Sequence, residues 1–192
     1  MVRKKSGERK QQILQALAMM LEEPQGMKVT TAALAAKVGI SEAALYRHFA
    51  SKAQMFEGLI EFIESGVFSV INRICENEER GLTQVRNIVR LLLGFSERNP
   101  GMTRVMMGDA LIYENPRLQK RMNQFFDRIE LTLRQSMRLA ATQESHLDEK
   151  SAIMRSNLLM NCLIGRMTRF VKGGFSNPPT AGIQDQVAFI LS

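Results

Sequence analysis

The sequence predicts an all-α protein, and three of its features support that prediction. Apolar residues recur at intervals of three and four along most of the 192 residues, which is the spacing of one helix face. No stretch alternates apolar and polar residues with the period of two that a half-buried strand shows. The five prolines all fall between the periodic segments, where they mark connections. We therefore expect helices joined by turns.

A basic arm and an amphipathic helix come first. Residues 1–10 carry five basic side chains against the single acidic Glu8. Such an arm is typical of proteins that contact nucleic-acid phosphates, although a solvated tail has the same composition. The turn residues 24–26 end the helix that follows. Its apolar stripe consists of Ile13, Leu14, Leu17, Ala18 and Leu21.

Two short helices with a tight turn between them are predicted next. Either Thr30 or Thr31 can cap the first helix, because each hydroxyl can accept a hydrogen bond from a free amide of the first turn. Gly39 allows a left-handed turn at little cost. Ser41 then caps a second helix, expected at about 41–48. Two helices joined in this way match the spacing of a helix-turn-helix motif.

The outward face of the second short helix differs from an ordinary solvated surface. Leu45 and Phe49 are expected to point into the core, which leaves outward the residues Glu42, Ala43, Ala44, Tyr46, Arg47 and His48. The alanines are small enough to let a helix lie deep in the major groove, and the larger side chains can reach phosphates or base edges. The alternative is that Tyr46 and His48 only pack against the helix and cap it.

Lys52 adds a separate indication of an anionic partner. It lies in the first turn of the next helix, directly after the expected cap Ser51. A cation at that position opposes the helix dipole, whereas a bound phosphate would pair with the ammonium and with the free amides. A solvated lysine is the alternative. We interpret the whole segment as DNA-binding.

Four longer apolar stripes predict a second domain at 55–192, after a first domain at 1–54. The first stripe begins near Ser51 and continues through Phe56, Leu59, Ile60, Ile63, Val67, Val70, Ile71 and Ile74. The second ends at residues 99–101 and contains Leu82, Val85, Val89, Leu92 and Leu93. The third follows residues 115–116 and contains Leu118, Met122, Phe125, Phe126, Ile129, Leu133 and Met137. The fourth contains Ile153, Leu158, Leu159, Cys162, Leu163, Met167, Phe170 and Val171.

A last helical segment is predicted at 182–192, after the glycine and proline pairs of residues 173–179. Its pattern is still running at Ser192, so we expect this final helix to be incomplete. No apolar run approaches the ~18 residues that a membrane span needs. Residues 1–10 also lead into an amphipathic pattern rather than into the apolar region of a signal peptide. We therefore expect a cytoplasmic protein.

Charge and composition favour a binding protein over an enzyme. The net charge is +7, and residues 1–57 hold nine Lys and Arg against five Asp and Glu. This excess indicates a polyanionic partner without naming it. Two histidines and two cysteines leave little for a metal site or a catalytic triad. The motifs HExxH, GxGxxG and GxxxxGK are absent, and GFSER at 94–98 lacks the closing glycine of a nucleophile elbow. We expect no catalysis, no metal and no cofactor.

The run from Ile13 to Leu59 resembles the TetR family of regulators, most specifically in LYRHFASK at 45–52. This resemblance implies an N-terminal three-helix DNA-binding domain and a C-terminal helical domain for dimerisation and regulation. It implies phosphate contacts from Thr31, Tyr46, His48 and Lys52. It implies contacts to bases from Ser41, Glu42, Ala43 and Ala44. The DNA-binding set that we predict also includes Thr30 and Arg47.

Further motifs resemble the branch of that family that acts in nucleoid occlusion. They are TTAALAAKVGISEAALYRHFASK, LIEFIE at 59–64, LLLGFSERNPGMTR at 91–104 and FFDRIE at 125–130. The similarity runs from roughly residue 10 to 172. It implies a nucleoid-associated protein that binds specific chromosomal sites and there antagonises polymerisation of the division protein FtsZ. The implied partners are double-stranded DNA and the C-terminal tail of FtsZ, with no small-molecule inducer.

The resemblance also implies where the FtsZ tail binds. Phe62 lies off the main apolar stripe of the long helix, so its side chain is available for contact. The predicted set is Phe62, Leu91, Gly94, Arg98 and Asn99. Gly94 allows close approach and Arg98 can pair with carboxylates. Without the resemblance, core packing of Phe62 and Leu91 and a helix-end role for Arg98 would explain these residues equally well.

The fourth long stripe predicts dimerisation, because its helix is apolar on more than one face. We expect a homodimer, or a higher-order assembly on DNA, that binds a pseudo-palindromic site. The predicted dimer contacts are Leu159, Cys162, Leu163, Arg166, Met167 and Phe170.

The alternative function is a TetR-type repressor that a small ligand releases from DNA. Such a repressor needs a pocket within residues 80–175 whose polar groups converge on the ligand. The candidate groups are Thr103, Asp109, Tyr113, Asn157 and Asn161.

Overall fold

The computed structural model describes residues 6–23 and 29–192 of the chain. Every regular element in these two ranges is helical and no strand occurs there, which confirms the predicted fold class. The basic residues at 1–5 and the predicted helix end at 24–26 lie outside the described residues. None of the described helices is long and apolar enough to cross a lipid bilayer.

Three helices form the N-terminal domain: α1 (Ser6–Met20), α2 (Thr31–Val38) and α3 (Glu42–Tyr46). The cap of α2 is Thr30, whose hydroxyl accepts a hydrogen bond from the Ala33 amide at 3.2 Å. Gly39 ends α2 in the left-handed region at φ 73°, where a side chain would be strained. These two residues fix the length of α2 and turn the chain into α3.

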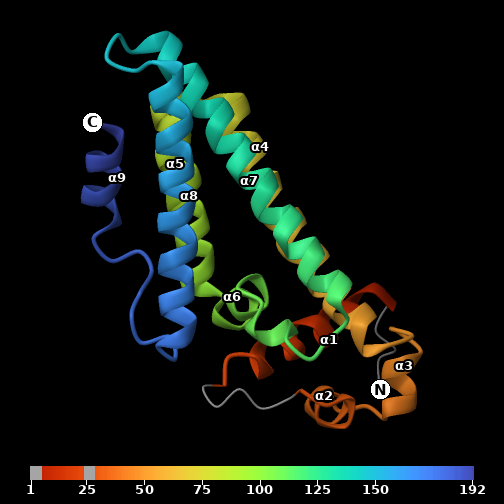
Figure 1. The fold of residues 1–192 in the computed structure, drawn as a ribbon. Helices are drawn as coiled ribbons and strands as arrows, with labels where there is room; N and C mark the ends of the chain where they lie inside the picture. The colour runs from red at the N-terminus through yellow and green to blue at the C-terminus, as the bar shows by residue number, and fades with distance from the viewer. Residues whose placement is uncertain (1–5, 24–28) are drawn as a thin grey trace.

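Four long helices make up the rest of the scaffold: α4 (Lys52–Asn77), α5 (Gly81–Arg98), α7 (Pro116–Gln143) and α8 (Glu149–Lys172). In Figure 1, α4 lies beside α7 and α5 beside α8, and the two pairs converge at the end of the molecule opposite the N-terminal domain. Helix α4 runs without a break through the predicted domain boundary at 54–55, so the two domains share one helix.

A small polar network ties the converging ends of the long helices together. Gln84 and Ser136 are 5% and 2% exposed, and the Ser136 hydroxyl donates to the Gln84 side-chain oxygen at 2.7 Å. The Gln84 amide in turn donates to the Glu78 carbonyl at 2.6 Å, just past the end of α4. At Gly81 a Cβ atom would lie 2.3 Å from the Ser136 carbonyl oxygen. Only glycine lets α5 approach α7 this closely.

Two shorter elements connect α5 to α7: α6 (Pro100–Met106) and the 3-10 turn η1 (Asp109–Leu111). The sequence patterns predicted only the end of a helix at 99–101. Pro100 does end α5, but it also begins α6, because its fixed φ suits the first position of a helix and its missing N–H is not needed there. The final helix, α9 (Ile183–Leu191), packs on α8.

Helix α6 packs the two domains against each other. A Cβ atom on Gly101 would lie 2.0 Å from the Ala18 carbonyl oxygen of α1, so the two backbones are in direct contact. Arg104 is only 8% exposed and donates to the Glu23 carbonyl at 2.8 Å. The same guanidinium lies 4.9 Å from the centre of the Phe175 ring. Arg104 thus joins the residues just after α1 to the segment after α8.

Candidate DNA and protein interfaces

The outer face of α3 is exposed as the sequence patterns predicted. Leu45 is completely buried and Phe49 is 7% exposed, and these two side chains hold α3 on the core. The opposite face leaves Ser41, Glu42, Ala43, Tyr46 and Arg47 exposed and Ala44 half-buried. Tyr46 is 45% exposed, so part of its side chain is accessible at the surface. This face has the small and hydrogen-bonding side chains that a major-groove contact uses.

Helix α3 is shorter than the predicted range of 41–48. Ser41 is its cap, with its hydroxyl accepting from the Ala44 amide at 3.2 Å, and the helix ends at Tyr46. Arg47 and the half-buried His48 lie in the turn that follows, where the His48 amide donates to the Leu45 carbonyl at 2.9 Å. Thr30 is exposed and Thr31 is half-buried at the start of α2.

Lys52 is held inside the protomer rather than left in solvent. Its ammonium contacts the Glu114 carboxylate, and the two side chains are 24% and 12% exposed. The ammonium also lies 5.7 Å from the centre of the Phe56 ring. At the start of α4, the Ser51 hydroxyl accepts from the Gln54 amide at 3.2 Å, and the Gln54 side chain accepts from Ala50 at 2.9 Å. Lys52 is therefore paired within the chain, and its phosphate contact stays a prediction.

The five residues predicted to bind FtsZ lie on two neighbouring helices. Phe62 projects from α4 and is 45% exposed, as expected from its position off the stripe. On α5, the guanidinium of the exposed Arg98 lies over Gly94, with its nearest nitrogen 3.3 Å from where a Cβ atom would be. Leu91 is half-buried, and the Asn99 amide donates to the Phe95 carbonyl at 2.7 Å. A larger residue at 94 would push Arg98 away from the helix.

The structure corrects most of the predicted dimer contacts. Leu159, Leu163, Met167 and Phe170 are between 0 and 3% exposed, and they fill the core of the protomer itself. Their side chains point inward, so they have no surface to offer a second copy. These four side chains of α8 are covered instead by the neighbouring helices of the same chain, chiefly α7.

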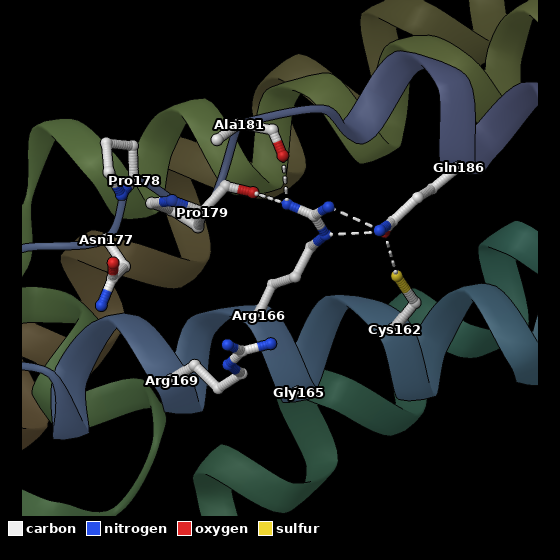
Figure 2. Close-up of a pocket in the computed structure, with 9 residues that line it drawn as sticks. All are labelled: Cys162, Gly165, Arg166, Arg169, Asn177, Pro178, Pro179, Ala181 and Gln186. Atoms are coloured by element: carbon white, nitrogen blue, oxygen red, sulfur yellow. Dashed lines mark hydrogen bonds between the residues drawn. The ribbon is translucent and has the colours of Figure 1, made fainter.

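Arg166 also has an internal role, shown in Figure 2. Its guanidinium donates to the Pro179 and Ala181 carbonyls at 2.8 Å each and to the Gln186 side-chain oxygen at 2.7 Å. Arg166 thereby holds the segment between α8 and α9 in place. The half-buried Cys162 thiol lies 3.6 Å from the same Gln186 oxygen. A cavity of about 450 Å³ opens beside this arrangement, between α8 and residues 177–186.

Four other apolar side chains are exposed on α7, α8 and α9. Met154 and Leu158, one helical turn apart on α8, are 63% and 53% exposed. Phe189 on α9 is 83% exposed and Leu131 on α7 is 49% exposed. Arg155 donates to the Ile190 carbonyl at 2.7 Å, which holds the end of α9 beside this part of α8. The i, i+4 spacing of Met154 and Leu158 was visible in the sequence, but their exposure was not.

The polar groups considered for a small-ligand pocket do not converge. Thr103 is completely buried, and its hydroxyl donates to the Ser96 carbonyl at 2.9 Å. Tyr113 is 84% exposed, and Asp109, Asn157 and Asn161 are exposed as well. These five groups therefore do not supply the concave polar site that a repressor's ligand would need.

Comparisons with known proteins agree with this arrangement. The family described as bacterial regulatory proteins, tetR family, matches residues 13–59, and the tetracyclin repressor-like C-terminal domain of the SlmA-like type matches residues 79–192. Among solved structures, a TetR-like transcriptional regulator from Rhodococcus sp. RHA1 superposes with a TM-score of 0.76 at 19% identity, covering 98% of this chain and 96% of that one. At this identity the likeness shows the fold alone.

Curated relatives match over almost the whole chain. Nucleoid occlusion factor SlmA of Vibrio vulnificus (strain YJ016) is 48% identical over 187 residues, covering 97% of this chain and 95% of the relative. The protein of the same name from Vibrio cholerae is 49% identical and covers 95% and 93%. That of Alteromonas mediterranea is 47% identical and covers 96% and 94%. The chain therefore belongs to the TetR family of bacterial regulatory proteins, in the group whose relatives are named nucleoid occlusion factor SlmA.

Proposed function

We propose that this protein is a nucleoid occlusion factor that binds specific chromosomal sites as a dimer and, when bound, antagonises FtsZ polymerisation. The observation that carries the proposal is the 48% identity to a protein of that name over 97% of the chain. Similarity of this extent includes the second domain, whose surface would meet FtsZ. The protein acts by binding two partners in the cytoplasm, at the nucleoid, without catalysis and without a cofactor.

The exposed face of α3 supports the DNA half of the proposal. Ser41, Glu42 and the two alanines lie where a recognition helix presents residues to base edges. Tyr46, Arg47 and His48 follow at the end of the helix, where they can contact phosphates. Thr30, Thr31 and Lys52 complete the phosphate contacts at the starts of α2 and α4.

The exposed apolar set of Leu131, Met154, Leu158 and Phe189 is the dimer interface in this proposal. These side chains lie on three helices of the second domain, and a two-fold axis through this surface would bury each against its symmetry-related copy. Large exposed apolar side chains on neighbouring helices support a contact surface in this domain. Two copies carry two α3 helices, which predicts a pseudo-palindromic site.

The surface between α4 and α5 receives the C-terminal tail of FtsZ in this proposal. Exposed Phe62 and half-buried Leu91 offer apolar contact, and Arg98 offers a bidentate partner for a carboxylate. Gly94 lets the Arg98 guanidinium lie against the α5 backbone, beside the apolar contacts. An acidic peptide with apolar residues fits this combination.

The test is FtsZ polymerisation with GTP, followed by light scattering. A duplex that the protein selects from a random library is added, with a scrambled duplex as the control. We expect loss of polymer only with the selected duplex. Arg98→Asp should bind the selected duplex normally and leave FtsZ polymers intact, because it reverses the charge that meets the peptide. Unchanged polymers with wild-type protein and selected DNA would reject the FtsZ part of the proposal.

A further inference from the structure

The contact between Lys52 and Glu114 joins a proposed phosphate-binding residue to the second domain. Lys52 begins α4 at the DNA side, and Glu114 lies in the turn between η1 and α7. We propose that Glu114 competes with the DNA backbone for Lys52, so that a bound phosphate displaces Glu114 and releases this turn. The inference rests on the proposed DNA-binding function and adds Glu114 as a residue that lowers the affinity for DNA.

The charges of the three groups explain why Lys52 would exchange Glu114 for a phosphate. An ammonium has three donors and could reach two acceptors, but a phosphate bound to Lys52 would stand close to the Glu114 carboxylate. Two anions a few ångströms apart repel each other. The Glu114 side chain is only 12% exposed, so water and salt screen this repulsion less than they would at an open surface. When DNA binds, Glu114 therefore loses its ion pair with Lys52 and lies close to a phosphate that repels it.

Two ion pairs between α4 and α7 have the opposite polarity to the Lys52–Glu114 pair. Glu57 on α4 pairs with Arg117 on α7 at 2.8 Å, and Glu64 pairs with Arg121 at 2.6 Å. The Glu64 carboxylate raises the pKa of the Arg121 guanidinium further, so this pair stays charged. In both pairs the cation is on α7, so neither cation lies in the first turn of α4 or among the proposed phosphate contacts. These two pairs keep α7 on α4 while the turn at Glu114 opens.

The turn that carries Glu114 has few other contacts of its own. Ile112 and Tyr113 are 68% and 84% exposed. The Glu114 amide donates to the Leu111 carbonyl at 3.0 Å, and beyond the turn the Asn115 side chain caps α7 by accepting from the Arg117 amide at 3.1 Å. Loss of the Lys52 contact should therefore loosen residues 112–114 and leave α7 formed.

The experiment measures DNA affinity of the full chain by fluorescence anisotropy with the selected duplex. Glu114→Gln should bind about two- to fivefold more tightly per half-site, which is the range of a surface ion pair. Glu57→Gln is the matched control, because it removes the same charge from the same helix contact without touching Lys52. It should change the affinity much less. In a Lys52→Ala background, Glu114→Gln should have no effect.

Hydrogen exchange provides a second measurement. On addition of the selected duplex, the Glu114 amide should exchange faster in the wild-type chain and at an unchanged rate in Lys52→Ala. The inference would be overturned if Glu114→Gln tightened DNA binding equally with and without Lys52, or if Glu57→Gln tightened it as much as Glu114→Gln does. Either result would mean that the effect is only long-range repulsion between a carboxylate and DNA. Wild-type affinity for Glu114→Gln would overturn it as well. A wild-type chain that selects no DNA would instead reject the proposed function.

Discussion

At the residue scale, removal of the Tyr46 hydroxyl tests whether Tyr46 contacts a DNA phosphate. Tyr46 is exposed at the end of α3, and a hydroxyl that donates to a phosphate contributes about 1.5–3 kcal/mol. We expect Tyr46→Phe to raise the Kd for the selected duplex about tenfold or more per half-site. The salt dependence should stay the same, because no charge is removed.

The matched control for Tyr46→Phe is Tyr113→Phe. It removes a hydroxyl of the same kind from an 84% exposed ring outside α3. Its affinity should equal that of the wild type. Equal affinities for all three proteins would remove the Tyr46 hydroxyl from the phosphate contacts.

A second residue-scale prediction concerns Gly101, where α6 meets α1. A Cβ atom there would lie 2.0 Å from the Ala18 carbonyl oxygen, so Gly101→Ala must push the two domains apart. Overpacking of this kind costs about 1–3 kcal/mol. Gly66→Ala on α4 is the control, since its Cβ would meet nothing within 4 Å. It should stabilise the helix by about 0.5–1 kcal/mol. Urea unfolding of both variants measures the two effects, and equal stabilities would contradict the tight contact.

At the scale of one element, the cap of α8 makes stability depend on pH. The Ser151 amide donates to the Asp148 carboxylate at 2.6 Å and lowers the pKa of that carboxyl. A carboxyl whose pKa is lower in the folded state stabilises the fold above its unfolded pKa, about 3.9, and this contribution is lost as the pH falls through the folded pKa. Asp148→Asn keeps a capping oxygen but cannot ionise.

We therefore expect the wild-type chain to have a higher urea midpoint than Asp148→Asn at pH 7. The difference should shrink as the pH falls from about 5 to about 3. Circular dichroism at 222 nm follows α8 together with the other helices. A difference that stays constant over this range would mean that ionisation of Asp148 does not stabilise the cap.

At the scale of the whole molecule, the exposed apolar set of α7, α8 and α9 predicts the assembly. Leu158→Glu would place a charge in the proposed interface, where it would be buried without a partner. We expect a monomer by sedimentation equilibrium. Affinity for the pseudo-palindromic duplex should fall about 10²–10⁴-fold, because the second half-site no longer binds on the same particle. Ile112→Glu, at a 68% exposed position outside this set, should remain a dimer. If Leu158→Glu remained a dimer, the dimer interface would have to lie outside this apolar set.

The sequence by itself determined the features that depend on near neighbours along the chain. The cap at Ser41, the left-handed turn at Gly39 and the outward face of α3 each follow from residues within one or two turns. The apolar stripes of the four long helices predicted the core in the same way, because helical spacing sets which side chains share a face. Family motifs then linked α3 to DNA and Phe62 to FtsZ.

Only the tertiary structure decided which long-range partner each exposed or charged side chain takes. Lys52 pairs with Glu114, which lies 62 positions away in the sequence, and Arg166 donates hydrogen bonds to the segment before α9. Leu163 belongs to the core of its own protomer, whereas Leu158 on the same helix remains exposed. Helical periodicity states which residues share a face, but the neighbouring helices decide which faces are covered. Lys52, one of the basic residues that indicated a DNA-binding protein, is therefore linked by its ion pair with Glu114 to the domain proposed to bind FtsZ.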